Sequence, residues 1–134
     1  MPRKALTVRQ RAIKAGYRSG LEEDTAKMLT KMKVPYTYEK TKIKWEDFMV
    51  RTYTPDFVLH NGIIIETKGR FMAADRRKHL EIRKQYGDEY DIRFVFSNSK
   101  SKLSKGAKSS YGDWCTKNGF LYADTVIPKE WLNE

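Results

Sequence analysis

The chain has 134 residues, of which 33% are charged and 40% hydrophobic, and its formal net charge at pH 7 is +10. This length predicts a single domain with its own core, and this composition excludes a disordered or fibrous chain. One cysteine, Cys115, excludes an intrachain disulfide and a cysteine-rich zinc site. Because no secretory signal and no apolar run long enough to span a bilayer is visible, we expect a soluble, cytoplasmic protein with no membrane partner.

The positive charge is concentrated in two blocks. The first precedes the first acid, Glu22, and consists of Arg3, Lys4, Arg9, Arg11, Lys14 and Arg18. The second lies in the acid-free stretch 97–110 and consists of Lys100, Lys102, Lys105 and Lys108. Such blocks favour contact with a polyanion, since each neutralised phosphate releases counterions. The alternative is a solvated surface that only keeps the protein soluble.

The first elements are an arm and a helix. Residues 1–17 read as a flexible basic arm, and residues 18–134 as one domain. Residues 19–33 are expected to be helical, with Ser19 as the N-cap and Glu22 in the position of a capping-box acid. Pro35 ends this helix.

The remaining elements alternate between strands and helices. Strands are expected at 36–45, at 48–59 with an interruption at Pro55, at 63–68 and at 92–96, and Glu46-Asp47 is read as a break between the first two. Helices are expected at 72–86 and, after the N-cap Ser110, in a short segment closed by Asn118-Gly119. A brief strand near Leu121 and a turn after Pro128 complete the chain. The order α-β-β-β-α-β, followed by a short α-β-α, indicates an α/β fold.

The turn at Asn61-Gly62 sets the register of the two strands around it. A two-residue turn would place Asp56 opposite Thr67, and Glu66 would then point to the other face. A three-residue loop would place Asp56 opposite Glu66, and Gly62 stands where such loops need a left-handed residue. We predict this loop, or a bulge near Pro55 with the same effect.

With that register, Asp56, Glu66 and Lys68 share one face of the hairpin. Two carboxylates about 4 Å apart repel each other by roughly 4 kcal/mol at an effective dielectric constant of 20. A divalent cation offsets this repulsion, and oxygen ligands favour Mg²⁺ or Mn²⁺. Glu22 is a candidate third carboxylate, although it also suits a capping box. Lys68 suits a scissile phosphate or its water, although a lysine at a strand end also reaches solvent.

Several stretches of the chain resemble the phage endonuclease I family, the Holliday-junction resolvases of T-odd phages. The resemblance runs from about Arg18 to Trp131. The stretches are Arg18-Ser19-Gly20-Leu21-Glu22, Thr52-Tyr53-Thr54-Pro55-Asp56-Phe57, Asn61-Gly62-Ile63, Glu66-Thr67-Lys68-Gly69, Asp75-Arg76-Arg77-Lys78-His79-Leu80 and Ile127-Pro128-Lys129-Glu130-Trp131. This family lies within the PD-(D/E)xK (restriction-endonuclease-like) nuclease superfamily, whose α-β-β-β-α-β core has the element order predicted here.

The resemblance implies a deoxyribonuclease with two Mg²⁺ or Mn²⁺ ions in each active site and no organic cofactor. Asp56 would bridge the metals, Glu66 would bind one of them and Glu22 the other. The backbone carbonyl of Thr67 would be a further ligand, and Lys68 would assist the water nucleophile. The products would carry 5′-phosphate and 3′-hydroxyl ends.

The resemblance also implies a homodimer with exchanged segments, acting on branched DNA in the host-cell cytoplasm. The segment 43–51 would bridge the two partners, and Glu22 of one chain would complete the site of the other. The expected DNA-backbone contacts are Arg18, Arg76, Arg77, Lys78, Lys100, Lys102 and Lys105, which otherwise form solvated surface. The alternatives are a sequence-specific nickase of the same superfamily and a non-catalytic nucleic-acid-binding module.

Overall fold

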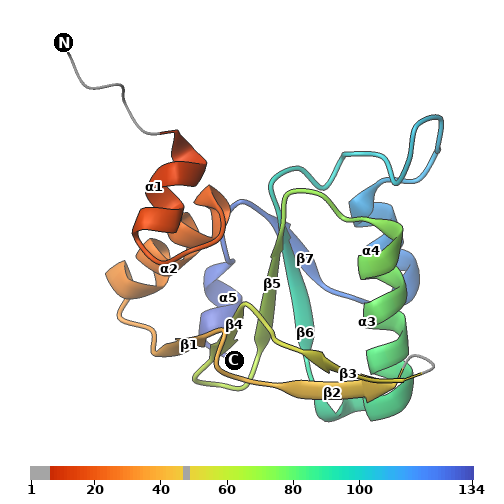
Figure 1. The fold of residues 1–134 in the computed structure, drawn as a ribbon, viewed down its shortest axis with the longest axis horizontal. Helices are drawn as coiled ribbons and strands as arrows, with labels where there is room; N and C mark the ends of the chain where they lie inside the picture. Colours follow the sequence, from red (N-terminus) through yellow and green to blue (C-terminus); the bar gives the residue numbers. More distant parts are fainter. Residues whose placement is uncertain (1–6, 47–48) are drawn as a thin grey trace.

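The computed structural model describes residues 7–46 and 49–134, which form an α/β fold around a five-stranded mixed sheet (Figure 1). The elements in chain order are α1 Val8–Lys14, α2 Gly20–Lys31, β1 Tyr36–Tyr38, β2 Ile43–Glu46, β3 Val50–Tyr53, β4 Phe57–Leu59, β5 Ile64–Lys68, α3 Ala73–Tyr86, the 3₁₀ turn η1 Gly87–Glu89, β6 Ile92–Phe96, α4 Tyr111–Asn118, β7 Tyr122–Asp124 and α5 Lys129–Leu132. Among the described residues, no helix is long and apolar enough to cross a membrane.

The main sheet has the strand order β1-β4-β5-β6-β7, and β2 and β3 form a separate hairpin. β1, β4 and β5 pair antiparallel, whereas β5, β6 and β7 pair parallel. β5 and β6 lie in the middle and are buried on both faces, as their continuous apolar runs predicted. The catalytic candidates on β5 therefore stand on a central, buried strand of the fold.

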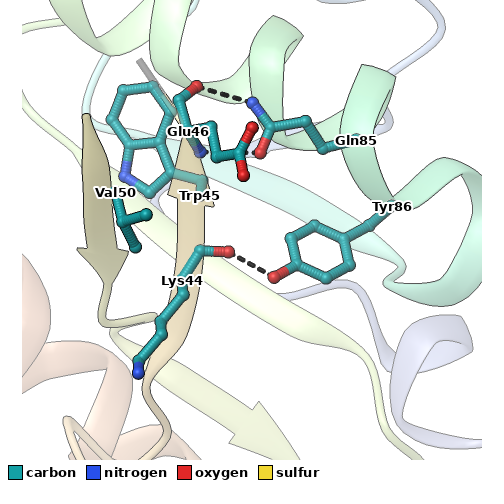
Figure 2. Close-up of a pocket in the computed structure, with 6 residues that line it drawn as sticks. All are labelled: Lys44, Trp45, Glu46, Val50, Gln85 and Tyr86. Carbon is teal, nitrogen blue, oxygen red and sulfur yellow. Dashed lines mark hydrogen bonds between the residues drawn. The ribbon is translucent and has the colours of Figure 1, made fainter. Parts of the chain in front are cut away.

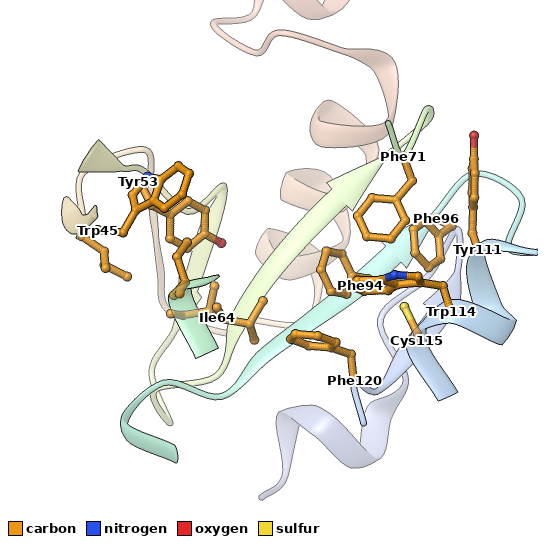
Figure 3. Close-up of a cluster of buried hydrophobic side chains, with 13 residues drawn as sticks. Trp45, Tyr53, Ile64, Phe71, Phe94, Phe96, Tyr111, Trp114, Cys115 and Phe120 are labelled. Atoms are coloured by element: carbon orange, nitrogen blue, oxygen red, sulfur yellow. The ribbon is translucent and has the colours of Figure 1, made fainter. Parts of the chain in front are cut away.

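Two hydrophobic clusters cover the two faces of this sheet. One lies between the sheet and helices α3 and α4, and its aromatic centre is Phe71, Phe94, Phe96, Trp114 and Phe120 (Figure 3). The indole of Trp114 stacks on the ring of Phe120, with centroids 5.4 Å apart. The other cluster lies beneath α2 and α5. The fold thus has three layers, and α2 lies on the opposite face from α3.

Two predicted strands are each divided in the structure. The stretch 36–45 becomes β1 and β2, because Glu39 adopts a left-handed conformation with φ +50° and turns the chain out of the sheet. The stretch 48–59 becomes β3 and β4, separated at Pro55 as the proline suggested. β2 and β3 pair with each other from Ile43↔Tyr53 to Glu46↔Val50, and the prediction of a break at Glu46-Asp47 lies partly outside the described residues.

The prediction of a flexible arm over residues 1–17 needs correction within the described part. Val8–Lys14 is a helix, and reciprocal hydrogen bonds between Thr7 and Gln10 cap its start. Ala12 is fully buried where α1 packs on α2. The arm prediction considered charge alone and overlooked this capping pair and the small residue facing α2.

The other predicted elements are confirmed. The hydroxyl of Ser19 accepts the backbone N–H of Glu22 at 3.1 Å, and α2 ends at Lys31, before Pro35. The hydroxyl of Ser110 accepts the N–H of Asp113, and α4 ends at Gly119 with φ +75°.

Candidate active site

The hairpin of β4 and β5 has the predicted three-residue loop. Leu59 N–H donates to Ile63 O at 2.8 Å, and Gly62, at φ +88°, donates its N–H to Leu59 O at 2.9 Å. The paired residues are Phe57↔Ile65 and Val58↔Ile64, so the next pair outward is Asp56 and Glu66. The N–H of Asp56 donates to Oε2 of Glu66 at 2.9 Å. Turn chemistry therefore brings the two carboxylates together.

Asp56 is buried and its two carboxylate oxygens have different partners. Oδ2 accepts two hydrogen bonds from Thr67, one from the N–H and one from the hydroxyl, both 2.9 Å long. Oδ1 faces the guanidinium of Arg18, whose Nη2 lies 3.3 Å away. One oxygen is thus fixed by the protein, and the other is open to a cation.

Glu66 is buried beside Asp56. Its Oε1 lies 3.8 Å from Nζ of Lys68 and 3.9 Å from Nε2 of His79. Burial, together with the negative charge of Asp56, raises the pKa of Glu66 to about 7, although the positive charge of Lys68 opposes the shift. Glu66 is therefore poised to exchange its proton for a cation near neutral pH.

Lys68 points into the site and not into solvent. Its side chain is only 17% exposed, and Nζ lies 3.4 Å from Oδ1 of Asp75 on α3. Asp75 is itself held by the N–H of Met72 at 3.1 Å. The alternative of a lysine that reaches solvent from a strand end is therefore wrong.

Glu22 projects from the first turn of α2 toward the same edge of the sheet. Its Oε2 accepts the N–H of Arg18 at 3.1 Å and the hydroxyl of Tyr38, so Glu22 does not close a capping box on Ser19. Burial raises the pKa of Glu22, and the hydrogen bond from Tyr38 opposes that shift. Glu22 lies within reach of Asp56 of the same chain.

Glu39 is a site residue that the sequence analysis missed. One carboxylate oxygen from each of Glu22, Glu39 and Asp56 lies within 4.8 Å of the others, which is close enough for one cation. Glu66 is not in this group. Glu39 follows β1, and its left-handed backbone turns the chain at this point. A positive φ at a charged residue beside a cluster of acids indicates a functional position, but the sequence alone does not reveal it.

The predicted DNA contacts divide into three groups. Arg18 lies among the carboxylates, and Lys78 is half-buried, with Nζ 5.3 Å above the ring of Tyr53. Burial lowers the pKa of Lys78, and the charge of Lys68 lowers it further. Arg76 is half-buried and donates to Phe71 O at 2.6 Å. The exposed residues are Arg77, Lys100, Lys102 and Lys105. Their contact with DNA, and the role of the Thr67 carbonyl as a ligand, stay predictions.

A surface hollow of about 540 Å³ lies between the β2–β3 hairpin and α3 (Figure 2). The side-chain amide of Gln85 bonds both backbone groups of Glu46, at 2.7 and 2.6 Å, and the hydroxyl of Tyr86 donates to Lys44 O. None of the lining residues is a candidate catalytic residue. This hollow marks where the hairpin docks on α3 and not the chemical site.

The donors at the site suit a hard divalent cation. Asp56 Oδ1 and Glu22 Oε1 face the guanidinium of Arg18, and Glu66 Oε1 faces the ammonium of Lys68. Carboxylate oxygens are the ligands that Mg²⁺ and Mn²⁺ prefer. An α/β fold in which buried carboxylates and a lysine converge at the end of a central strand has the features of a candidate hydrolase site.

Comparison with known proteins defines the family. Residues 4–134 match the Phage endonuclease I family. The chain is 48% identical over 119 residues to Endonuclease I of Escherichia phage T7. The aligned region covers 88% of this chain and 79% of the T7 protein. It is also 48% identical over 122 residues to Endodeoxyribonuclease 1 of Enterobacteria phage T3, covering 88% and 78%. The chain belongs to the phage endonuclease I family, as its motifs suggested.

Proposed function

We propose that this protein is a metal-dependent DNA endonuclease that resolves four-way junctions and other branched DNA in the cytoplasm of the host cell. The observation that supports this most is the pairing of Asp56 with Glu66, with Lys68 and Glu22 directed at the same edge of the sheet. The family and its T7 relative are both named as endonucleases, and the name of the T3 relative specifies DNA as its substrate. We assign the core to the PD-(D/E)xK superfamily.

The carboxylates divide naturally between two cation positions. Glu66 and Asp56 would hold one ion, and Glu22 with Asp56 would hold the second, so that Asp56 bridges both. When bound, the two ions would supply Lewis-acid stabilisation of the attacking and leaving oxygens. Attack of water on phosphorus with breakage of the P–O3′ bond would leave 5′-phosphate and 3′-hydroxyl ends. The residues fit Mg²⁺ or Mn²⁺ because every proposed side-chain ligand offers oxygen.

The protein's own groups have separate tasks in hydrolysis. Thr67 fixes Asp56 through Oδ2, so that Oδ1 keeps one direction. Lys68, held between Glu66 and Asp75, would hold the attacking water or a phosphate oxygen. The exposed lysines of the 97–110 loop would contact the DNA backbone, which gives selectivity for junction shape over base sequence.

Junction resolution requires two symmetric cuts, and one chain supplies one site, so we propose a homodimer. In the structure Glu22 reaches Asp56 of its own chain. The β2–β3 hairpin follows the segment that carries Glu22, and the same contacts would form between partners if that segment were exchanged. A mixture of Glu22→Gln and Asp56→Asn chains separates the two arrangements. An exchanged dimer regains one intact site and nicks one strand, whereas a dimer without exchange stays inactive.

A junction assay tests the proposed activity. A four-way junction and linear duplexes with the same arm sequences are incubated with the protein and Mg²⁺, and a second junction carries scrambled arms. We expect symmetric cuts near the branch point in both junctions and little cutting of the duplexes. Cutting that follows sequence and ignores branching would instead indicate the sequence-specific nickase, and no cutting with any divalent ion would indicate a binding module.

A further inference from the structure

The guanidinium of Arg18 lies on the carboxylate oxygens that a cation would need. Its Nη2 is 3.3 Å from Asp56 Oδ1 and 3.6 Å from Glu22 Oε1. Its Nε is 2.7 Å from Oε1 of Glu39. One side chain thus spans all three members of the carboxylate group within 4.8 Å.

The other oxygen of each proposed ligand is already used by the protein. Asp56 Oδ2 accepts both donors of Thr67. Glu22 Oε2 accepts the hydroxyl of Tyr38 and the backbone N–H of Arg18. The remaining oxygens of Asp56 and Glu22 face a single nitrogen, Nη2 of Arg18. A metal ion bound by these two oxygens would occupy the space that Nη2 now fills. The two positive charges would also repel each other there.

We propose that Arg18 is a tethered cation that holds Glu22 and Asp56 together before metal binds, and that a divalent ion displaces its Nη2. This inference rests on the proposed metal site. Glu39 would keep the guanidinium nearby through Nε, since it contacts a different nitrogen from the one that must leave. Arg18 is a positioning residue in this scheme: without metal it limits the repulsion among buried carboxylates, and its displacement opposes metal binding.

The exposure of the side chains makes this exchange feasible. The side chain of Arg18 is 68% exposed, whereas those of Glu22 and Asp56 are 6% and 4% exposed. The guanidinium can therefore move outward while the two ligands stay fixed in the core. This position also accounts for the predicted DNA contact of Arg18, because a displaced guanidinium faces solvent, where a phosphate would approach.

Calorimetric titration of Mn²⁺ into the full chain without DNA tests the proposal. The variants are Arg18→Gln and, as a control of equal charge change, Lys27→Gln, which lies on α2 and pairs with Glu23 at 2.9 Å. We expect Arg18→Gln to bind Mn²⁺ about tenfold more tightly than the wild type, since both the competitor and its charge are gone. Lys27→Gln should bind as the wild type does.

The outcomes separate this inference from the proposed function. Equal Mn²⁺ affinity in the wild type and Arg18→Gln overturns the role of Arg18 and leaves the metal site standing. Absence of binding in the wild type and in Lys27→Gln overturns both.

A second measurement on the wild type needs no variant to fold. The Nη–Hη NMR signal of Arg18 is followed while Ca²⁺ is added, because Nη2 is the nitrogen that would leave its carboxylate partners. We expect it to shift with the same saturation curve as metal binding, because the partners of the guanidinium change. A signal that does not move at saturating Ca²⁺ contradicts displacement.

Discussion

Thr67 holds Asp56 through two hydrogen bonds that end on the same carboxylate oxygen, one from its backbone N–H and one from its hydroxyl. Both are 2.9 Å long and buried. This double contact leaves Oδ1 as the oxygen that faces Arg18. The residue between Glu66 and Lys68 therefore fixes the direction of the carboxylate that we propose to bridge the metals.

Thr67→Val should impair catalysis more than folding. Valine keeps the shape and the N–H but loses the hydroxyl donor, which costs about 1 kcal/mol in stability. With Asp56 Oδ2 held by the backbone N–H alone, we expect kcat/KM on a junction to fall about tenfold, as measured by gel assay at limiting Mg²⁺. Thr67→Ser, which retains the hydroxyl, is the matched control. A loss of activity in the serine variant as large as in the valine variant would contradict this role.

Tyr38→Phe should weaken the site through Glu22. The phenol donates to Glu22 Oε2, and its own pKa is raised by burial and by that hydrogen bond. Without the phenol, Glu22 loses a donor, and we expect Mn²⁺ affinity to fall about fivefold in calorimetric titration. Tyr36→Phe on the same strand removes a hydroxyl that lies 3.3 Å from the hydroxyl of Tyr17, so it should bind Mn²⁺ as the wild type does. Equal losses in the two variants would contradict a specific role for Tyr38.

Glu66→Gln should stabilise the metal-free protein at neutral pH. The pKa of Glu66 is raised from 4.5 to about 7 in the fold, so ionisation in the native state costs stability as pH rises between these values. The glutamine amide oxygen can still accept the N–H of Asp56. We expect the variant in chelator to be about 2 to 3 kcal/mol more stable than the wild type at pH 8, and the difference to vanish near pH 4.

Denaturant unfolding at several pH values measures that difference. The comparison with Glu66→Gln is needed because His79 titrates in the opposite sense. Burial holds the pKa of His79 well below 6.5, so the native state loses stability as pH falls below that value. This contribution is common to both proteins and cancels. A difference in stability that does not depend on pH would show that Glu66 ionises normally.

Binding of Mn²⁺ should depend on pH in the same window. The ion must displace the proton from Glu66, whose pKa is about 7, so affinity should rise with pH and level off above about 8. Titrations from pH 6 to 8.5 should show a rise of about tenfold, accompanied by proton release. An affinity that stays constant across this range would remove Glu66 from the metal site.

The sequence predicted the core of the site because turn chemistry is local. The position of Gly62 distinguishes two registers, and one of them places Asp56 opposite Glu66, as the structure confirms. The capping residues Ser19 and Ser110 likewise determine helix starts within a few residues.

The outer members of the site could not be predicted in this way. Glu39 and Arg18 meet Asp56 only through the packing of α2 on the sheet and the pairing of β1 with β4, and no spacing in the sequence encodes that meeting. Lys78 looks like one of three surface cations on a helix, yet its Nζ lies over the ring of Tyr53 and feels the charge of Glu66. The pattern of charges in the sequence identifies a basic helix face. It does not show which lysine of that face turns toward the core.

The most direct test of the central claim compares neighbouring acids on one helix turn. Glu22 is buried beside Asp56, whereas Glu23 pairs with the exposed Lys27 and is not in the carboxylate group. Both are changed to glutamine, and cleavage of a four-way junction with Mg²⁺ is measured for each variant and for Glu66→Ala. We predict that Glu22→Gln and Glu66→Ala lose at least about 100-fold in rate while Glu23→Gln cuts as the wild type does. Wild-type rates in Glu66→Ala or Glu22→Gln would show that these carboxylates do not form the active site.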